Sequence, residues 1–243
     1  MGGGRFAEDV KVIGFDGDDT LWHSEDAFAQ AQQRLVGVLA AHASDTEVAA
    51  QLQAIQRRNL DLFGYGIKAF TLCMIETAIE LSSGSVPVTD IEHLLRTGQE
   101  MLARPVDLLA GVAETLPRLA DNYRLALITK GDLLNQESKI ARSGLMHMFE
   151  TVNILSEKTA DAYLKILRTL EIEPEQFLMV GNSEVSDARP VLAMQGWVAL
   201  VPYPLTAAHE RGSQLDQLSP RVRILERIDQ LPPLLSGASQ PPS

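Results

Sequence analysis

A long helical segment interrupts this chain between its first strand-like run and all of the others. Residues 10–16 form a short β-rich run that ends in acidic and glycine residues, which is typical of a buried strand followed by a loop. Beyond this run, alanine, glutamine and leucine dominate and the apolar period becomes helical. After Pro105, strand and helix patterns alternate, which favours a mostly parallel sheet covered on both faces. The sequence therefore predicts an α/β core, residues 1–22 and 105–243, with a helical domain inserted at residues 23–104.

The inserted segment predicts four helices, which is enough for a small antiparallel bundle. They are expected near residues 24–42, 45–62, 66–82 and 89–103. Two capping boxes support helix starts, because in each a hydroxyl can accept from the third helical amide while a glutamate reaches back. The two boxes are Ser44 to Glu47 and Thr89 to Glu92. Gly64 and Gly84 are placed to end the helices before them.

The rest of the chain predicts a doubly wound, Rossmann-like parallel sheet. Strands are expected at residues 123–129, 152–155, 177–180, 197–201 and 222–225, the last at a sheet edge. Helices are expected at residues 108–122, 161–170 and 187–195. Residues 236–243 are rich in proline, serine and glycine, and we expect this tail to be disordered.

Composition narrows the partners that such a chain can have. The 243 residues are 45% hydrophobic and 22% charged, which is ordinary for a globular protein. A formal net charge of −11 argues against nucleic-acid binding, which needs a basic face, but it does not forbid a small anionic substrate. No uninterrupted apolar run of about 18 residues occurs, so no membrane span is expected. The single cysteine, Cys73, excludes an internal disulfide and fits a reducing cytoplasm, where we expect the protein; its oligomeric state stays open.

Polar clusters close the strand-like runs, and ligands of parallel sheets bind at those carboxyl ends. They are Asp16–Thr20, Thr129–Asp132, Ser156–Lys158 and Gly181–Asp187. Each alone is typical of a plain turn, but together they supply carboxylates, a hydroxyl, a lysine and a glycine turn. If the strand order brings them together, they form one site.

Such a site suits phosphoryl transfer, which needs positioning and charge neutralisation. Asp16 can attack phosphorus, and Asp18 can protonate the leaving oxygen and later deprotonate water. Mg²⁺ prefers oxygen ligands and would be held by carboxylates. Thr129 can donate to a phosphate oxygen, and Lys158 can balance negative charge.

In this arrangement the chain resembles the haloacid dehalogenase superfamily, whose four motifs all have counterparts. The first, DxDxT, is similar to Asp16-Gly-Asp18-Asp-Thr20, with the first aspartate as nucleophile and the second as acid/base and carbonyl ligand of Mg²⁺. The second is similar to the apolar run ending at Thr129, and the third is Lys158. The fourth, GDxxxxD, is similar to Gly181 to Asp187, with Asn182 in place of the first aspartate. Asp19 stands where many members have glycine.

The resemblance implies a Mg²⁺-dependent phosphatase that acts on a small phosphorylated metabolite through an aspartyl-phosphate. The implied catalytic residues are Asp16, Asp18, Thr129 and Lys158. The implied metal ligands are Asp16, Asp18, Asn182 and Asp187. Substrate contacts are expected from Thr129, Lys130, Gly131 and Lys158. The helical insertion corresponds by position to the superfamily's cap, which closes over the site and selects the substrate.

Several alternatives stay open. Dehalogenase-type relatives generally lack the second aspartate, so Asp18 favours phosphate-ester chemistry, but a phosphomutase or a non-catalytic small-molecule binder could share the fold. Residues 57–68 of the insertion predict either a substrate-facing loop or a glycine-capped connection between helices. Trp22 and His23 could line the site or serve only in packing and at the surface.

Overall fold

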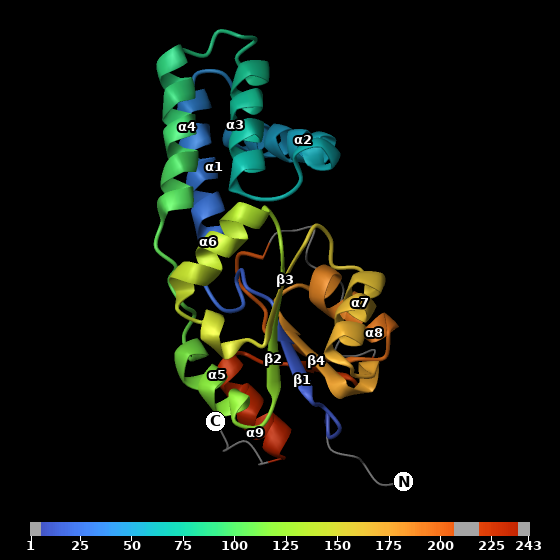
Figure 1. The fold of residues 1–243 in the computed structure, drawn as a ribbon. Coiled ribbons are helices and arrows are strands. Elements are labelled where there is room, and N and C mark those ends of the chain that lie inside the picture. Colours follow the sequence, from blue (N-terminus) through green and yellow to red (C-terminus); the bar gives the residue numbers. More distant parts are fainter. Residues whose placement is uncertain (1–5, 207–218, 238–243) are drawn as a thin grey trace. The chain divides into compact units, whose positions relative to one another are not determined.

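The computed structural model describes residues 6–206 and 219–237, which form two compact units (Figure 1). The first unit is the described part of Met1–His23, Val106–Lys130 and Ile140–Ser243. The second comprises Ser24–Pro105 and Gly131–Lys139. Residues 24–105 of the second unit lie one residue later than the expected domain of residues 23–104. Residues 131–139, which were expected in the core, group with the helical unit. None of the described helices is both long and apolar enough to cross a membrane.

The first unit is built on a parallel sheet, which confirms the predicted α/β fold. In the described residues its strands follow the order β3-β2-β1-β4-β5-β6, and every neighbouring pair is parallel. They are β1 (Val12–Phe15), β2 (Arg124–Lys130), β3 (Thr151–Leu155), β4 (Phe177–Gly181), β5 (Trp197–Leu200) and β6 (Val222–Ile224). Strand β1 lies between β2 and β4, and β6 is an edge strand as predicted.

Helices cover both faces of this sheet (Figure 1). Because side chains alternate along a strand, Ile13 and Phe15 of β1 enter one core while Val12 enters the other. The first core is completed by α5 (Val112–Ala120) and α9 (Leu231–Ser236), the second by α7 (Ala160–Leu170) and α8 (Arg189–Ala193). Burying each large apolar side chain contributes about 1.5–3 kcal/mol, so these two cores hold the strand ends in place.

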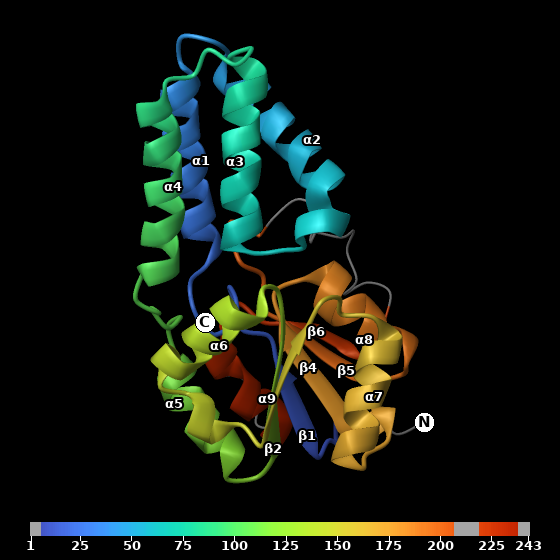
Figure 2. The same ribbon diagram turned by 45° about the horizontal axis from the view of Figure 1, so that its top comes forward.

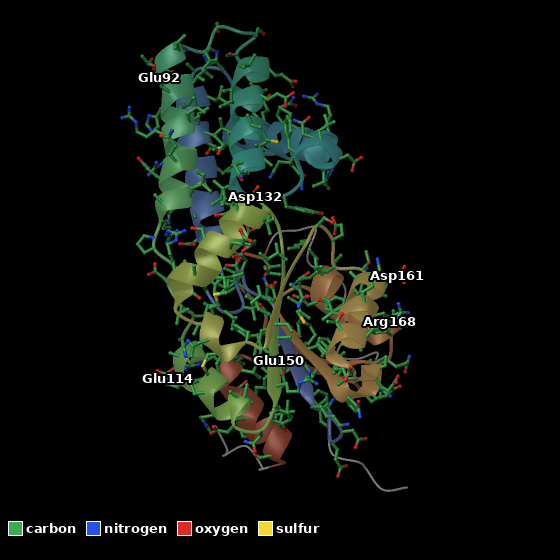
Figure 3. All side chains as sticks on the ribbon, viewed as in Figure 1. Glu92, Glu114, Asp132, Glu150, Asp161 and Arg168 are labelled. Atoms are coloured by element: carbon green, nitrogen blue, oxygen red, sulfur yellow. The ribbon has the colours of Figure 1, made fainter. Side chains whose placement is uncertain are left out.

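The outer surfaces of these helices are polar. Asp161 and Arg168 lie along the exposed side of α7, and Glu114 lies on the exposed side of α5 (Figure 3). Tyr163, Ile166 and Leu167 face inward from α7, which gives this helix the one-sided apolar pattern of a sheet-covering helix.

The second unit is a helical bundle with its own core (Figure 2). Its four predicted helices are all present, with ends shifted by a few residues. They are α1 (Glu25–Leu39), α2 (Asp45–Phe63), α3 (Ile67–Leu81) and α4 (Val88–Ala103). Fully buried Leu35, Ile55, Met74 and Leu94 supply one anchor from each helix.

One of the two predicted capping boxes is present. The Ser44 hydroxyl accepts from the Glu47 amide, and the Glu47 carboxylate accepts from the Ser44 amide at 2.9 Å. The box predicted at Thr89 is wrong, because α4 already begins at Val88 with Pro87 as its N-cap. Thr89 therefore falls inside the first turn of α4 and cannot be its N-cap.

Several other boundaries differ from the expectations. The helix expected from residue 108 begins at Val112, because the preceding residues pair with the first motif through a bridge between Trp22 and Leu108. Helices α6 (Leu133–Ser143) and α9 were not predicted, and α6 contributes to both units. Because α9 runs through Ser236, the expected disordered tail starts too early; its residues 238–243 lie outside the described residues.

Candidate active site

The strand register brings the predicted motif residues to one edge of the sheet. Phe15 is level with Leu127 of β2 and Val180 of β4, and the Asp16 amide continues the ladder by donating to the Val180 carbonyl at 2.9 Å. Asp16 therefore lies at the carboxyl end of the central strand β1, between the ends of β2 and β4. This is the edge at which parallel sheets bind ligands.

Lys158 joins two of the predicted carboxylates. Its Nζ lies 2.6 Å from Asp16 Oδ1 and 2.6 Å from Asp187 Oδ1, and all three side chains are buried. The lysine follows β3, whereas the aspartates follow β1 and β4. A buried charge is tolerated only when it is paired and hydrogen-bonded, so these contacts fix the three side chains relative to one another.

The charges of this triad do not cancel. Burial raises the pKa of the Asp16 carboxyl to about 7, although Lys158 opposes the shift. Burial by itself would lower the pKa of Lys158, but the charges of Asp16 and Asp187 outweigh it and raise the pKa, so the ammonium stays protonated. Two carboxylates beside one ammonium leave either one excess negative charge or one bound proton. The site is thus suited to an additional cation.

Thr20 lies between the other oxygen of Asp16 and the amide oxygen of Asn182. The Thr20 hydroxyl lies 3.3 Å from Asp16 Oδ2 and 3.5 Å from Asn182 Oδ1. The carboxylate oxygen and the amide oxygen thus both lie at the same hydroxyl. The amide oxygen of Asn182 is therefore on the side of the nucleophile candidate.

Thr206 explains why the amide of Asn182 has this orientation. The buried Thr206 hydroxyl donates to the Tyr203 carbonyl at 2.8 Å, so it acts as the acceptor for Asn182 Nδ2 at 3.2 Å. An amide that presents its nitrogen to Thr206 presents its oxygen on the opposite side, towards Thr20. Thr206 follows β5 and was not a candidate in the sequence.

Asp187 has both carboxylate oxygens engaged. Oδ1 accepts from Lys158, and Oδ2 accepts from the Ser183 amide at 3.0 Å. The carboxylate packs against Gly181 so closely that a Cβ there would overlap its oxygen and carbon atoms. The π-helical turn η3 (Glu184–Ala188) carries Asp187 back over the end of β4. The glycine and aspartate of the fourth motif are therefore in direct contact, which accounts for their joint presence.

Thr129 has a buried hydroxyl without a hydrogen-bond partner among the described residues. A Cβ on Gly17, next to the nucleophile candidate, would lie 3.4 Å from Thr129 Oγ1, so this hydroxyl reaches the first motif. An unpaired buried hydroxyl costs about 1–3 kcal/mol, which a bound acceptor such as a phosphate oxygen would recover.

The two residues after Thr129 differ in their placement. Lys130 Nζ donates to the Ser186 hydroxyl at 2.9 Å, so this lysine reaches the fourth motif. Gly131 has a φ of 135°, which favours glycine, and belongs to the segment that groups with the helical unit. The expected substrate contacts of both residues remain predictions.

Asp18 is partly buried and contacts a tryptophan. The indole Nε1 of Trp22 donates to Asp18 Oδ1 at 2.6 Å. Asp19, where many members of the resembled superfamily have glycine, adopts a φ of 62°. Its backbone amide donates a hydrogen bond to the Trp22 carbonyl at 2.7 Å and so tightens the turn. His23 Nδ1 lies 2.9 Å from the Tyr203 hydroxyl.

The donor set of this site fits a hard divalent cation. Asp16 Oδ2 and Asn182 Oδ1 both lie within 3.5 Å of the Thr20 hydroxyl, and the buried triad has a negative charge to neutralise. In the part of the chain that the structure describes, no three or more His, Cys, Asp or Glu side chains form a metal cluster. The fit therefore depends on an amide oxygen and on backbone carbonyl oxygen, such as that of Asp18.

Residues 57–68 of the insertion form a glycine-capped connection between helices, the second of the two expected arrangements. Gly64 is the C-cap of α2 and Gly66 the N-cap of α3, both with positive φ. Arg58 of α2 pairs with Glu76 and Glu80 of α3 on the exposed surface of the bundle. Lys68 Nζ lies 2.8 Å from Oδ2 of Asp132, the residue just before α6.

Comparison with known proteins agrees with this architecture. A family model described as haloacid dehalogenase-like hydrolase matches residues 10–193. A search of curated proteins gave no match. Among solved structures, a haloacid dehalogenase-like family hydrolase from Xanthomonas campestris is 38% identical, with a TM-score of 0.83, and the match covers 95% of this chain and 94% of that one.

More distant structures share the fold. The magnesium-bound HAD-hydrolase YfnB from Bacillus subtilis is 15% identical, with a TM-score of 0.65 over 93% of this chain and 98% of that one. The L-2-haloacid dehalogenase from Xanthobacter autotrophicus is 18% identical, with a TM-score of 0.63 over 95% and 100%. The fold is therefore shared by a protein described as a magnesium-bound HAD-hydrolase and by one described as a haloacid dehalogenase. The family-model match over residues 10–193 and the 38% identical relative show that this chain belongs to the haloacid dehalogenase-like hydrolases.

Proposed function

We propose that this hydrolase is a Mg²⁺-dependent phosphatase that releases phosphate from a small phosphorylated metabolite. The observation that carries the proposal is the pairing of two aspartates with different surroundings. Asp16 is buried against Lys158, whereas Asp18 is partly exposed and bound to a neutral donor. Such a difference suits one group for attack and the other for proton transfer.

In the first half-reaction, an Asp16 carboxylate oxygen attacks phosphorus and forms an aspartyl-phosphate. The bond between phosphorus and the leaving oxygen breaks, and its electron pair stays on that oxygen. Asp18 supplies a proton to it, so the product leaves as an alcohol. Thr129 donates its unpaired hydroxyl to a phosphate oxygen, and Lys158 keeps Asp16 oriented.

In the second half-reaction, Asp18 takes a proton from a water molecule as the water oxygen attacks phosphorus. The bond between phosphorus and Asp16 then breaks, its electron pair returns to the carboxylate, and inorganic phosphate leaves. Asp18 is again protonated and ready for the next substrate. One carboxylic acid thus serves both halves.

Bound Mg²⁺ would neutralise charge on the phosphate and on Asp16. We propose Asp16, Asn182 and the Asp18 carbonyl as its direct ligands. Asp187, which was expected as a further ligand, is assigned here the role of holding Lys158, which it contacts at 2.6 Å. An amide oxygen binds a hard cation more weakly than a carboxylate does, so we expect modest metal affinity.

Asp18 also separates this proposal from dehalogenation. A halide leaves as a stable anion and needs no proton, whereas an alkoxide does. A carboxyl group two residues after the nucleophile is therefore needed as a proton donor in phosphate-ester cleavage but not in halide displacement. We assign the helical unit, which is inserted between Asp16 and Thr129 in the chain, to substrate selection.

The test is phosphate release from a panel of phosphorylated metabolites and from p-nitrophenyl phosphate, with Mg²⁺ or with EDTA. We expect turnover only with Mg²⁺ and its loss in Asp16→Asn. Chloride release from 2-chloropropionate, measured in parallel, should stay at background. Halide release without phosphate release would indicate a dehalogenase instead. Transfer of phosphate to a second position of the substrate would indicate a phosphomutase. No turnover of any substrate would indicate a non-catalytic binding role.

A further inference from the structure

Trp22 is fully buried although it carries a polar N–H group. A buried indole N–H normally finds an acceptor, and here the acceptor is Asp18 Oδ1 at 2.6 Å. This acceptor is the side chain that the proposed function uses for proton transfer. The contact thus joins the hydrophobic core to the acid/base group.

The backbone and the core fix the indole independently of the Asp18 side chain. Trp22 forms a bridge with Leu108, and its carbonyl accepts from the Asp19 amide at 2.7 Å. The ring also occupies the space beside Gly17, where a Cβ would lie 2.6 Å from Trp22 Cζ2. The glycine at position 17 is therefore the residue that gives the indole room to lie next to Asp18.

The indole favours one carboxyl oxygen as the site of the proton. An indole N–H can only donate, so Asp18 Oδ1 is the acceptor, and in a protonated carboxyl group the carbonyl oxygen accepts better than the hydroxyl oxygen. We propose that Trp22 is a positioning residue for acid catalysis: it holds Oδ1 and thereby assigns the transferable proton to Oδ2. This inference rests on the proposed phosphatase function.

The proposal concerns one step of the reaction. As the bond from phosphorus to the leaving oxygen breaks, its electron pair stays on that oxygen and the proton moves to it from Asp18 Oδ2. Without the indole N–H, Oδ1 loses the donor that marks it as the accepting oxygen, and the proton is no longer favoured on Oδ2. The loss should matter only when the leaving oxygen needs a proton.

Substrates that differ in leaving group test this directly. We compare kcat/KM of the wild type and Trp22→Phe for 2,4-dinitrophenyl, p-nitrophenyl, phenyl and alkyl phosphates, with saturating Mg²⁺. For the alkyl ester we expect a loss of about 10- to 100-fold, because a misplaced acid forfeits much of its catalytic effect. For the dinitrophenyl ester, whose leaving group needs no proton, we expect a loss within about 3-fold.

A matched control is Trp197→Phe, because Trp197 also donates its indole N–H, to the Glu175 carbonyl at 2.9 Å, but lies at the start of β5. Its leaving-group dependence should equal that of the wild type. Equal losses of Trp22→Phe on all four esters would indicate a structural role only and would overturn the proposal. So would unchanged kinetics.

A double-mutant cycle shows whether Trp22 acts through Asp18. In an Asp18→Asn background, adding Trp22→Phe should not steepen the leaving-group dependence further; an additional steepening would contradict the proposed route. If Trp22→Phe does not fold, as judged by circular dichroism, Trp22 is replaced by 3-benzothienylalanine, which keeps the ring shape without the N–H. Hydrolysis of the panel by the wild type tests the proposed function separately, so the two failures are distinguishable.

Discussion

Replacing Lys158 with methionine should reveal how strongly the buried charges of the site depend on one another. Lys158 Nζ contacts Asp16 and Asp187 at 2.6 Å each, and its side chain is 2% exposed. Methionine keeps most of the apolar stem and removes the charge. Since breaking a buried ion pair leaves an uncompensated charge, we expect the free energy of unfolding to fall by about 3–5 kcal/mol at pH 8.5.

The loss should depend on pH in a defined direction. Burial raises the pKa of Asp16 from 3.8 to about 7 with Lys158 present, and removing the cation must raise it further. When the pKa of a carboxyl group is higher in the folded than in the unfolded state, the protein loses stability as the pH rises from the unfolded to the folded pKa. Wild type and variant should therefore lose stability in parallel between pH 4 and 7. Above pH 7 they diverge by about 1.4 kcal/mol per pH unit, or about 2 kcal/mol by pH 8.5.

Urea unfolding at pH 6 and pH 8.5 measures the difference, with EDTA present because a metal bound only to the folded state would add its own stabilisation. Lys165→Met is the matched control, since Lys165 is exposed on α7; it should change stability by less than about 0.5 kcal/mol at both pH values. A Lys158→Met variant that resembles this control, or whose loss is the same at pH 6 and pH 8.5, would refute the reasoning.

Three further substitutions, two of them with a matched control, test other contacts. Gly181→Ala should lower the free energy of unfolding by about 1–3 kcal/mol, because its Cβ overlaps the Asp187 carboxylate; Gly37→Ala, in open space within α1, should instead raise it by about 0.5–1 kcal/mol in the same denaturation assay. Thr206→Val should weaken Mg²⁺ binding about 10-fold or more in calorimetric titration, because the Asn182 amide loses the acceptor that orients it. Thr206→Ser keeps the hydroxyl and should bind Mg²⁺ as the wild type does. Equal affinities of the two variants would contradict this role of Thr206. Ser44→Ala should cost about 1 kcal/mol of stability by removing the cap of α2, and an unchanged unfolding midpoint would show that the box is dispensable.

The sequence predicted the parts of this protein that follow local rules. Buried parallel strands are short apolar runs, and the polar residue after each run marks its carboxyl end, so the positions of Asp16, Thr129 and Lys158 could be read directly. The sheet order then brought these ends together, as required for one site. The roles assigned to these residues remain predictions until their chemistry is measured.

The contacts that the sequence did not predict depend on three-dimensional packing. Thr206 lies 24 residues beyond Asn182, in a loop with no motif, and only the folded chain brings the two side chains together. Trp22 is four residues from Asp18, yet the direction of its indole depends on the missing Cβ of Gly17 and on the bridge to Leu108. A possible signal was the combination of glycine between the aspartates and tryptophan directly after the motif.

The contacts of Lys158 also have a consequence for the order of folding. Its hydrogen bonds to Asp16 and Asp187 span 142 and 29 residues of the chain. Contacts of such separation form late, because the chain must lose much of its conformational freedom before they contribute, whereas the helical bundle is built from neighbouring segments. In an unfolding chain, the electrostatics of the site should therefore be among the first properties lost, before the helices of the insertion melt.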